Sequence, residues 1–162
     1  ELESVKNYLL SRDEYLFSKE LLQARGVWQL LLDHDKNFAS IPPYGKITSI
    51  SKNTGLINWQ IPFGTHIDNN GKIVKGSMNF GGVLSTKGNL LFATGSTDKK
   101  IYIYNSLNGK EIWSHKLEYA GSSAPMTYFY QGKQYIIVNA SGGKYYGYKD
   151  ELGDVIHAFR LF

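Results

Sequence analysis

Residues 79–113 read NFGGVLSTKGNLLFATGSTDKKIYIYNSLNGKEIW, and this stretch decides the fold. Short runs rich in β-branched and aromatic residues fill it, and turn-forming residues separate them. The runs predict strands over residues 82–86, 89–94, 100–105 and 111–117. Among the turns, Asn108-Gly109 gives the strongest signal, because a tight hairpin requires a positive φ there. Four strands so close together predict an up-and-down antiparallel sheet, the unit of a β-propeller.

Half of this unit is present twice, and the offset between the two copies is 54 residues along the whole match. Gly55 aligns with Gly109, and Trp59 aligns with Trp113. A repeat of this length indicates stacked blades. Each Trp is expected to fill the wedge between neighbouring blades and to donate its indole N–H to a backbone carbonyl of the next blade. The alternative is two unrelated hairpins, each with a core Trp, and the constant offset argues against it.

The composition is that of a globular β protein. Of the 162 residues, 42% are hydrophobic, and the chain contains 12 Tyr, 8 Phe and 17 Gly. The net charge is +4, with acidic residues interspersed among the basic ones, so a nucleic-acid-binding protein is not indicated. There is no cysteine, which excludes disulfides and thiolate metal sites. No apolar run approaches the ~20 residues of a membrane span, and no signal peptide opens the chain.

Two regions are expected along the chain. Residues 1–40 form a helical or irregular lead-in segment, with one or two short helices over residues 4–25. Residues 41–162 hold the blades. A half-blade is predicted over residues 46–51 and 56–62, then a long polar connection over residues 64–78 with a turn at Asn69-Asn70-Gly71, and then the complete blade. Three more strands follow, over residues 122–130, 133–140 and 155–161.

The predicted fold class is therefore all-β, a partial propeller of about two and a half four-stranded blades with Trp-docking motifs and a short helical N-terminal segment. A closed ring needs more blades, so the chain is expected to be the C-terminal piece of a larger propeller, and its first residue, Glu1, suggests an internal cut or processing. The partners of such a piece are the remaining blades. Alone, its unpaired sheet edges favour marginal stability or self-association.

Two groups of residues in this sequence invite a metal or catalytic interpretation. The first is Asp33-His34-Asp35, but three adjacent residues do not converge on one ion without a special loop, so a solvated turn is predicted. The second is His66 with Asp68, which are expected to be surface residues. No catalytic residue and no metal ligand is predicted in this chain.

Eight stretches distributed over residues 38–162 carry a resemblance to a known family. They are PPYGKITSI (42–50), NTG (53–55) with Trp59, PFGT (62–65), NFGG (79–82), NGKEIW (108–113), APMTY (124–128), GKQY (132–135) and SGG (141–143). In this order and spacing they resemble the C-terminal part of the pyrroloquinoline-quinone (PQQ)-dependent dehydrogenases, which are eight-bladed quinoprotein propellers. The sequence is most similar to the membrane-bound glucose/quinate/shikimate dehydrogenase type.

The resemblance implies oxidation of an alcohol, sugar or polyol hydroxyl, with electrons passed to a quinone acceptor. It implies PQQ on the propeller axis beside a Ca²⁺ ion, a carboxylate that takes the hydroxyl proton as hydride passes to PQQ, and a periplasmic location. The family's proton-abstracting Asp, calcium ligands and most PQQ contacts belong to earlier blades, and so does any membrane attachment. The chain alone is therefore expected to be inactive.

The resemblance also implies two cofactor-binding segments. These are Asn79, Phe80, Gly81 and Gly82, and then Gly142, Gly143 and Lys144. Phe80 stands where some relatives have Trp, and Lys144 departs from a Trp or His and offers a cation to a carboxylate of PQQ. The glycines would let a planar tricarboxylate approach the backbone closely. Both segments are expected at the same end of the sheets. The alternative is that both glycine pairs are ordinary turns at which a blade begins.

A second function remains open for the whole chain. Non-catalytic propellers of outer-membrane assembly share the Trp-docking repeat and hold no cofactor. The sequence upstream of this chain would separate the two interpretations, because only the dehydrogenase needs calcium ligands and a catalytic Asp there.

Overall fold

The computed structural model describes residues 31–34, 38–143 and 152–160, and every regular element in these ranges is a β-strand. All of the described strands belong to one compact unit, residues 33–162. The strands are β1 (Lys46–Ile50), β2 (Ile57–Pro62), β3 (Thr65–Ile67), β4 (Ile73–Lys75), β5 (Val83–Ser85), β6 (Leu90–Ala93), β7 (Lys100–Asn105), β8 (Glu111–Lys116), β9 (Met126–Tyr130), β10 (Lys133–Gly142) and β11 (Leu152–Arg160). The all-β prediction is confirmed.

Over the described ranges, no helix has the length and apolar character needed to cross a membrane. The helices expected over residues 4–25 lie outside these ranges.

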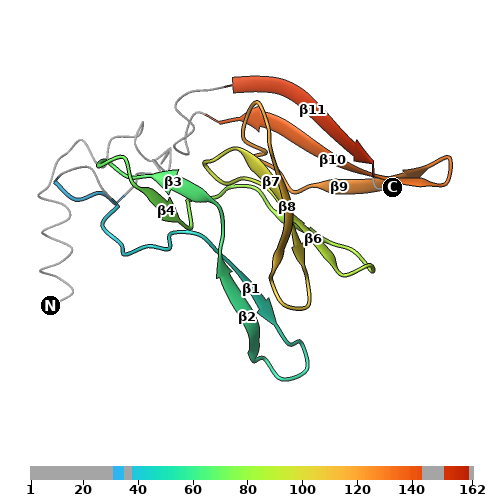
Figure 1. Ribbon diagram of the computed structural model, residues 1–162, viewed down its shortest axis with the longest axis horizontal. Helices are drawn as coiled ribbons and strands as arrows, with labels where there is room; N and C mark the ends of the chain where they lie inside the picture. The colour runs from blue at the N-terminus through green and yellow to red at the C-terminus, as the bar shows by residue number, and fades with distance from the viewer. Residues whose placement is uncertain (1–30, 35–37, 144–151, 161–162) are drawn as a thin grey trace, which may run out of the picture. The chain divides into compact units, whose positions relative to one another are not determined.

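The complete blade consists of β5 to β8, which pair antiparallel in chain order, as predicted (Figure 1). Residues with positive φ close its turns, among them Asn89 (φ 60°) before β6 and Gly109 (φ 71°) before β8. The two central strands bury side chains on both faces, with Tyr102 and Tyr104 on one side and Phe92 on the other. Because successive strand residues point to opposite faces, this pattern fits a sheet packed between two neighbours.

The predicted half-blade is also present. β1 and β2 pair antiparallel, with Lys46 opposite Pro62 at one end and Ile50 opposite Ile57 at the other. Gly55, with a φ of 71°, closes the turn between them and donates its N–H to the carbonyl of Ser51 at 2.8 Å.

The prediction of a long polar connection over residues 64–78 is wrong, because this segment contains the hairpin β3–β4. Asp68 closes the hairpin turn, since its Oδ1 accepts the N–H groups of Asn70 at 2.9 Å and Lys72 at 2.8 Å. The turn at residues 69–71 was expected, and Gly71 has a φ of 79°. Each strand has only three residues, which is too short for an alternating pattern to be recognised.

The last sheet has the order β11-β10-β9, with three boundaries that differ from the prediction. β9 begins at Met126 and not at residue 122, because Ser123 is engaged outside the sheet: its carbonyl accepts the Thr94 hydroxyl at 2.8 Å. β11 begins at Leu152, three residues before the predicted position 155. β10 ends at Gly142, two residues after the predicted end at 140, and so runs past Met126, the first residue of β9, with which Ile137 pairs.

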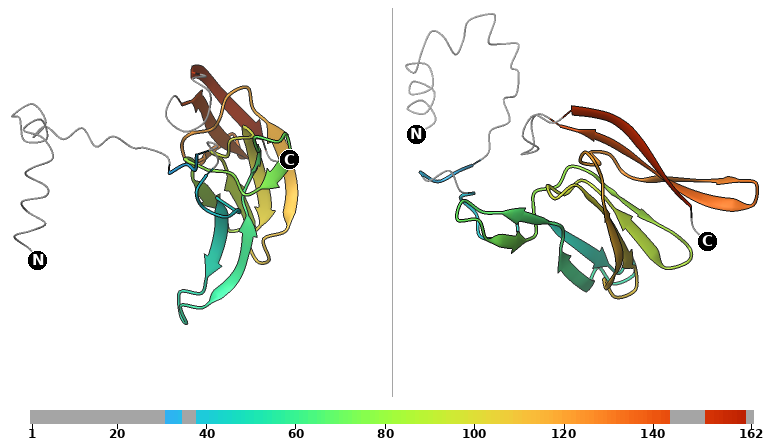
Figure 2. Two further views of the ribbon diagram at one scale, coloured as in Figure 1. Left: turned by 90° about the vertical axis from the view of Figure 1, so that its left-hand side faces the viewer. Right: turned by 45° about the horizontal axis from the view of Figure 1, so that its top comes forward.

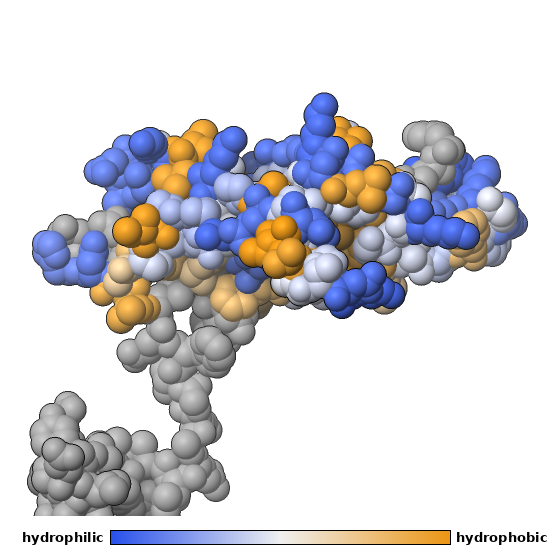
Figure 3. Space-filling view, turned by 90° about the horizontal axis from the view of Figure 1, so that it is seen from below, coloured by the Kyte–Doolittle hydropathy of each residue, from blue (hydrophilic) through white to orange (hydrophobic). Residues whose placement is uncertain are grey.

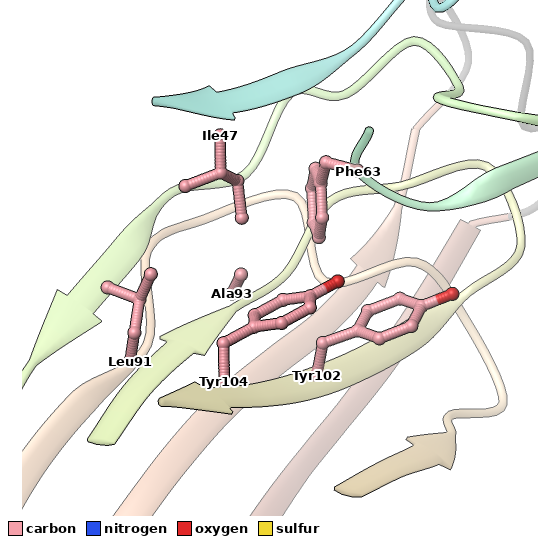
Figure 4. Packing of buried hydrophobic residues seen from close by; sticks show 6 residues of the cluster. All are labelled: Ile47, Phe63, Leu91, Ala93, Tyr102 and Tyr104. Carbon is pink, nitrogen blue, oxygen red and sulfur yellow. The ribbon is translucent and has the colours of Figure 1, made fainter. Parts of the chain in front are cut away.

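Two hydrophobic clusters join the half-blade, the complete blade and the last sheet. Figure 4 shows the first, in which Ile47 of β1 and Phe63 after β2 face Tyr102 and Tyr104 of β7. The rings of Tyr102 and Tyr104 are stacked with centroids 5.7 Å apart. Each large side chain buried in this way contributes about 1.5–3 kcal/mol to folding. This cluster therefore holds the half-blade against the complete blade.

The second cluster lies between the complete blade and the last sheet, which lie face to face in Figure 2. It contains Phe92 and Ile101 from the complete blade and Ile136 and Val138 from β10, all with at most 1% of their surface exposed. The hydrophobic side chains that stay exposed form separate patches among hydrophilic ones on the face shown in Figure 3. The described sheets are thus arranged as consecutive blades, each packed on the next.

The two repeated tryptophans have different environments. Trp59 donates its indole N–H to the backbone carbonyl of Ser106 in the next blade at 3.0 Å, as predicted. Trp113 is 40% exposed, stacks on His115 at 5.6 Å and contacts the edge of Phe159. The docking predicted for Trp113 is not tested by these contacts and stays a prediction. The reason is positional: Trp59 docks on the turn after β7, and the matching turn for Trp113 would come after β11, beyond the described residues.

Candidate functional site

The predicted segment Asn79–Gly82 runs beside the turn that joins β6 to β7. Asn79 forms an antiparallel bridge with Ser96, and the N–H of Phe80 donates to the carbonyl of Gly95 at 3.0 Å. At the other end of the segment, the carbonyl of Gly82 accepts the N–H of Thr94 at 3.2 Å. The conformation of the segment is therefore set by the β6–β7 turn as well as by β5, the next strand along the chain.

The glycines of this segment are needed for packing within the protein. A Cβ on Gly81 would lie 2.2 Å from the carbonyl oxygen of Thr94 and 2.8 Å from that of Gly121. A Cβ on Gly82 would lie 2.7 Å from the Cβ of Ala124. These distances are too short for real atoms, so any larger residue would displace the backbone of a neighbouring segment. Close packing within the protein therefore explains why glycine occupies both positions, without any ligand. This agrees with the alternative interpretation, in which the glycine pair forms an ordinary turn.

The second predicted segment lies at the same end of the sheets as the first. Gly142 donates its N–H to the carbonyl of Ala120 at 3.0 Å, and the next residue, Gly121, is the one that approaches Gly81. Both segments therefore border the connection between β8 and β9. Gly142 has a φ of 66°, and Gly143 is half-buried. Lys144 lies outside the described residues, and the role of both segments in binding a cofactor stays a prediction.

Two side chains of the first segment have the chemistry to contact a planar anionic ligand. Asn79 is exposed, and its carboxamide lies against Gly45, where a Cβ would be 2.6 Å from Nδ2. An amide N–H can donate a hydrogen bond to a carboxylate. Phe80 is half-buried and offers an aromatic ring for stacking. These residues fit a flat, carboxylate-bearing group such as PQQ.

Hydroxyl groups fix the start of the last blade next to this region. Thr94, which is 1% exposed, donates its Oγ1–H to the carbonyl of Ser123. The hydroxyls of Ser122 and Ser141 share a hydrogen bond of 2.9 Å, so the approach to β9 is tied to the end of β10. Hydrogen bonds from Thr94, after β6, and from Ser141 of β10 therefore hold the segment that precedes β9.

Asp98, in the β6–β7 turn, is a polar centre that the sequence pattern indicated only as a turn former. Its Oδ2 accepts the N–H of Thr65 at 2.8 Å, the hydroxyl of Thr65 at 3.0 Å and the hydroxyl of Tyr102. Its Oδ1 accepts the hydroxyl of Ser96 at 2.6 Å. An acidic residue flanked by small hydroxyl residues in a turn is too common a pattern to reveal such a centre from sequence.

The pKa values of the two tyrosines beside Asp98 are raised. Burial, together with the hydrogen bond to Asp98, raises the pKa of Tyr102. Burial, followed by the negative charges of Glu111 and Asp98, raises the pKa of Tyr104. Both phenols are therefore protonated at neutral pH, and Tyr102 acts as a hydrogen-bond donor to the carboxylate.

Among the described residues, no group of three or more His, Asp or Glu side chains is placed to hold a metal ion. His66 is half-buried, with its ring 5.0 Å from Tyr44, and Asp68 closes the hairpin turn. Asp35 lies outside the described ranges.

Comparison with protein families gives a match over residues 11–136. The matching family is PQQ: glucose/ethanol/alcohol dehydrogenase, β-propeller domain. The match includes the half-blade, the hairpin β3–β4, the complete blade and the start of the last sheet.

Several curated proteins are similar in sequence. The chain is 33% identical over 129 residues to "Quinate/shikimate dehydrogenase (quinone)" of Acinetobacter baylyi. It is 33% identical over 127 residues to "Quinoprotein glucose dehydrogenase" of Escherichia coli. Each match covers 74% of this chain and 16% of the relative, so the chain spans about a sixth of the length of these proteins.

Among solved structures, the fold is similar to that of the quinohemoprotein alcohol dehydrogenase from Comamonas testosteroni. The TM-score is 0.54 at 21% sequence identity, and the match covers 71% of this chain and 16% of that one. At this identity the likeness supports the propeller fold alone.

Proposed function

The chain belongs to the PQQ-dependent dehydrogenases, the β-propeller family of glucose, ethanol and alcohol dehydrogenases, and we propose that it forms the last blades of such an enzyme. The reaction is the oxidation of an alcohol, sugar or polyol hydroxyl, with the electrons passed to a quinone acceptor. The non-catalytic scaffold receives less support, because the similar curated proteins are named as dehydrogenases.

The family match over residues 11–136 is the observation that carries this proposal. The arrangement of the two predicted segments agrees with it, because Asn79–Gly82 and Gly142 both border Ala120–Gly121 at one end of the sheets. A single flat ligand at that end could therefore contact two consecutive blades.

PQQ, when bound, supplies the chemistry of the reaction by accepting two electrons from the substrate. The residues of this chain contribute binding and orientation. The Asn79 carboxamide would donate a hydrogen bond to a carboxylate oxygen of the cofactor. The Phe80 ring would pack against the edge of the cofactor but could not donate the hydrogen bond of an indole. Lys144 would offer a cation to a carboxylate of the cofactor. Calcium ligands and the group that takes the substrate proton come from other blades of the full-length protein.

The chain then functions only with partners. The remaining blades complete the ring, cover the exposed sheet faces and bring the catalytic groups, and a small alcohol or sugar is the substrate. By analogy with the family, the enzyme faces the periplasm.

A dehydrogenase assay of the full-length protein tests the proposal. The apoprotein is prepared with a chelator, reconstituted with PQQ and Ca²⁺, and supplied with glucose, quinate, glycerol or ethanol and an artificial electron acceptor. We expect PQQ-dependent reduction of the acceptor with at least one of these substrates. The 162-residue chain, treated in the same way, is the control and should be inactive. A full-length protein that oxidises no hydroxyl compound in the presence of PQQ would contradict the proposal.

A further inference from the structure

Asp98 joins three parts of the fold through one carboxylate. Thr65 belongs to the base of the hairpin β3–β4, Ser96 to the turn between β6 and β7, and Tyr102 to β7, and all three donate to it. Tyr102 is 5% exposed and Ser96 is fully buried, so at least two of these donors reach Asp98 from inside the protein. A carboxylate that accepts several hydrogen bonds from buried donors orders the segments that carry them.

The β6–β7 turn, which Asp98 orders, also fixes the backbone of the segment Asn79–Gly82. Ser96 donates to Asp98 through its side chain and is bridged to Asn79 through its backbone. One residue earlier, the carbonyl of Gly95 accepts the N–H of Phe80. Ser96 therefore links the carboxylate of Asp98 directly to Asn79, whose side chain is expected to bind the cofactor.

A second connection reaches the same segment from its N-terminal side. Thr97 donates its N–H to the Ser77 hydroxyl at 3.1 Å, and its own hydroxyl donates to the carbonyl of Thr65 at 3.2 Å. Ser77 in turn donates its hydroxyl to the carbonyl of Met78, the residue before Asn79. The β6–β7 turn thus holds the segment on both sides of Asn79, and Asp98 holds the turn to the hairpin base.

We propose that Asp98 is a positioning residue for cofactor binding. It fixes the β6–β7 turn through Ser96 and anchors it to Thr65, so that Asn79 and Phe80 are presented in the geometry that PQQ requires. The inference rests on the proposed function, since it assigns a role within that binding site. Small displacements of a binding group reduce binding strongly, which is why a supporting residue can control affinity without touching the ligand.

The test measures the dissociation constant of PQQ for the full-length apoprotein and, separately, the melting temperature of each variant. Asp98→Ala should weaken PQQ binding about tenfold or more. Asp98→Asn should stay within about threefold of wild type, because its carbonyl can replace Oδ2 while its NH₂ donates to the Ser96 hydroxyl. Asp68→Ala is the matched control, since Asp68 also accepts backbone N–H groups but only within its own hairpin turn. It should leave PQQ affinity unchanged.

Two further variants separate positioning from general stability. Ser96→Ala and Tyr102→Phe each remove one donor to Asp98, but only Ser96 is bridged to Asn79. Positioning predicts weaker PQQ binding in Ser96→Ala and unchanged binding in Tyr102→Phe, even where both lower the melting temperature. This pair decides the question if Asp98→Ala does not fold.

The inference is overturned if wild type binds PQQ and the variants Asp98→Ala and Ser96→Ala bind it equally well. It is also overturned if Ser96→Ala and Tyr102→Phe weaken binding to the same extent. A wild-type protein that does not bind PQQ at all contradicts the proposed function instead, so the two failures are distinguishable.

Discussion

The contact between Trp59 and Gly109 gives the sharpest test of how the blades dock. A Cβ on Gly109 would lie 2.8 Å from Cε3 of Trp59 and 3.1 Å from two further ring carbons. Gly109 also has a φ of 71°. Gly109→Ala therefore combines two costs, the left-handed backbone conformation and the displacement of the indole ring.

The sequence repeat supplies a matched control for this variant. Gly55 aligns with Gly109 in the repeat and has the same φ of 71°, but no atom lies within 4 Å of the position that its Cβ would take. Gly55→Ala should cost about 1–2 kcal/mol for the backbone conformation alone. Gly109→Ala should cost about 1–3 kcal/mol more, the usual penalty of forcing extra atoms into a packed contact.

The free energy of unfolding is measured by urea titration of the 162-residue chain, monitored by far-UV circular dichroism at several protein concentrations. In a Trp59→Ala background, the cost of Gly109→Ala should fall to that of Gly55→Ala, because the ring is gone. Equal costs for the two glycine variants in the wild-type background would refute the argument, as would an unchanged cost of Gly109→Ala after removal of the ring.

The remaining predictions concern the tryptophans, the buried tyrosines and Lys144. In the 162-residue chain, Trp59→Phe should lower the free energy of unfolding by about 1 kcal/mol, because the indole hydrogen bond to Ser106 is lost. Trp113→Phe should change it by less than about 0.5 kcal/mol, because Trp113 is 40% exposed. Equal effects of the two variants in urea titrations would mean that the docking geometry is misassigned. The pKa values of Tyr102 and Tyr104 are raised, so above about pH 10 the unfolded chain loses phenol protons that the folded chain keeps. The contribution of these two tyrosines to stability is therefore constant below that pH and falls above it by up to about 1.4 kcal/mol per pH unit for each tyrosine. Tyr104→Phe should make this alkaline decline less steep in thermal melts from about pH 8 to 11, and an identical slope in the variant would argue against the shift. In the full-length protein, Lys144→Ala should weaken reconstitution with PQQ and leave the melting temperature unchanged, and unaltered PQQ affinity would remove Lys144 from the site.

The sequence predicted the blades well because their signals are local. Turn residues such as Asn108-Gly109 and the constant offset between Trp59 and Trp113 depend on the periodicity of short strands, and the structure confirms the sheets that they indicate. The hairpin β3–β4 escaped prediction because its strands are very short and its turn depends on one side chain, Asp68.

The sequence predicted less of the candidate site than of the fold. The sequence did not reveal that Gly81 and Gly82 pack closely against Thr94, Gly121 and Ala124, and their role in binding a cofactor stays a prediction. Asp98 was overlooked because its donors come from residues 2 to 33 positions away, and such convergence is a property of the folded chain. For Trp113, the turn that matches the one at Ser106 would follow β11, outside the described residues, so its docking stays a prediction.

The most direct test of the central claim is a structure of the full-length protein crystallised with PQQ and Ca²⁺. These residues should form the last blades of a closed ring, with PQQ at the end of the sheets where Gly81 and Gly142 border Ala120–Gly121. Asn79 and Phe80 should lie in contact with the cofactor, and the Asp98 carboxylate should lie behind them. A ring that binds no PQQ, or that binds it at the opposite end of these sheets, would contradict the account.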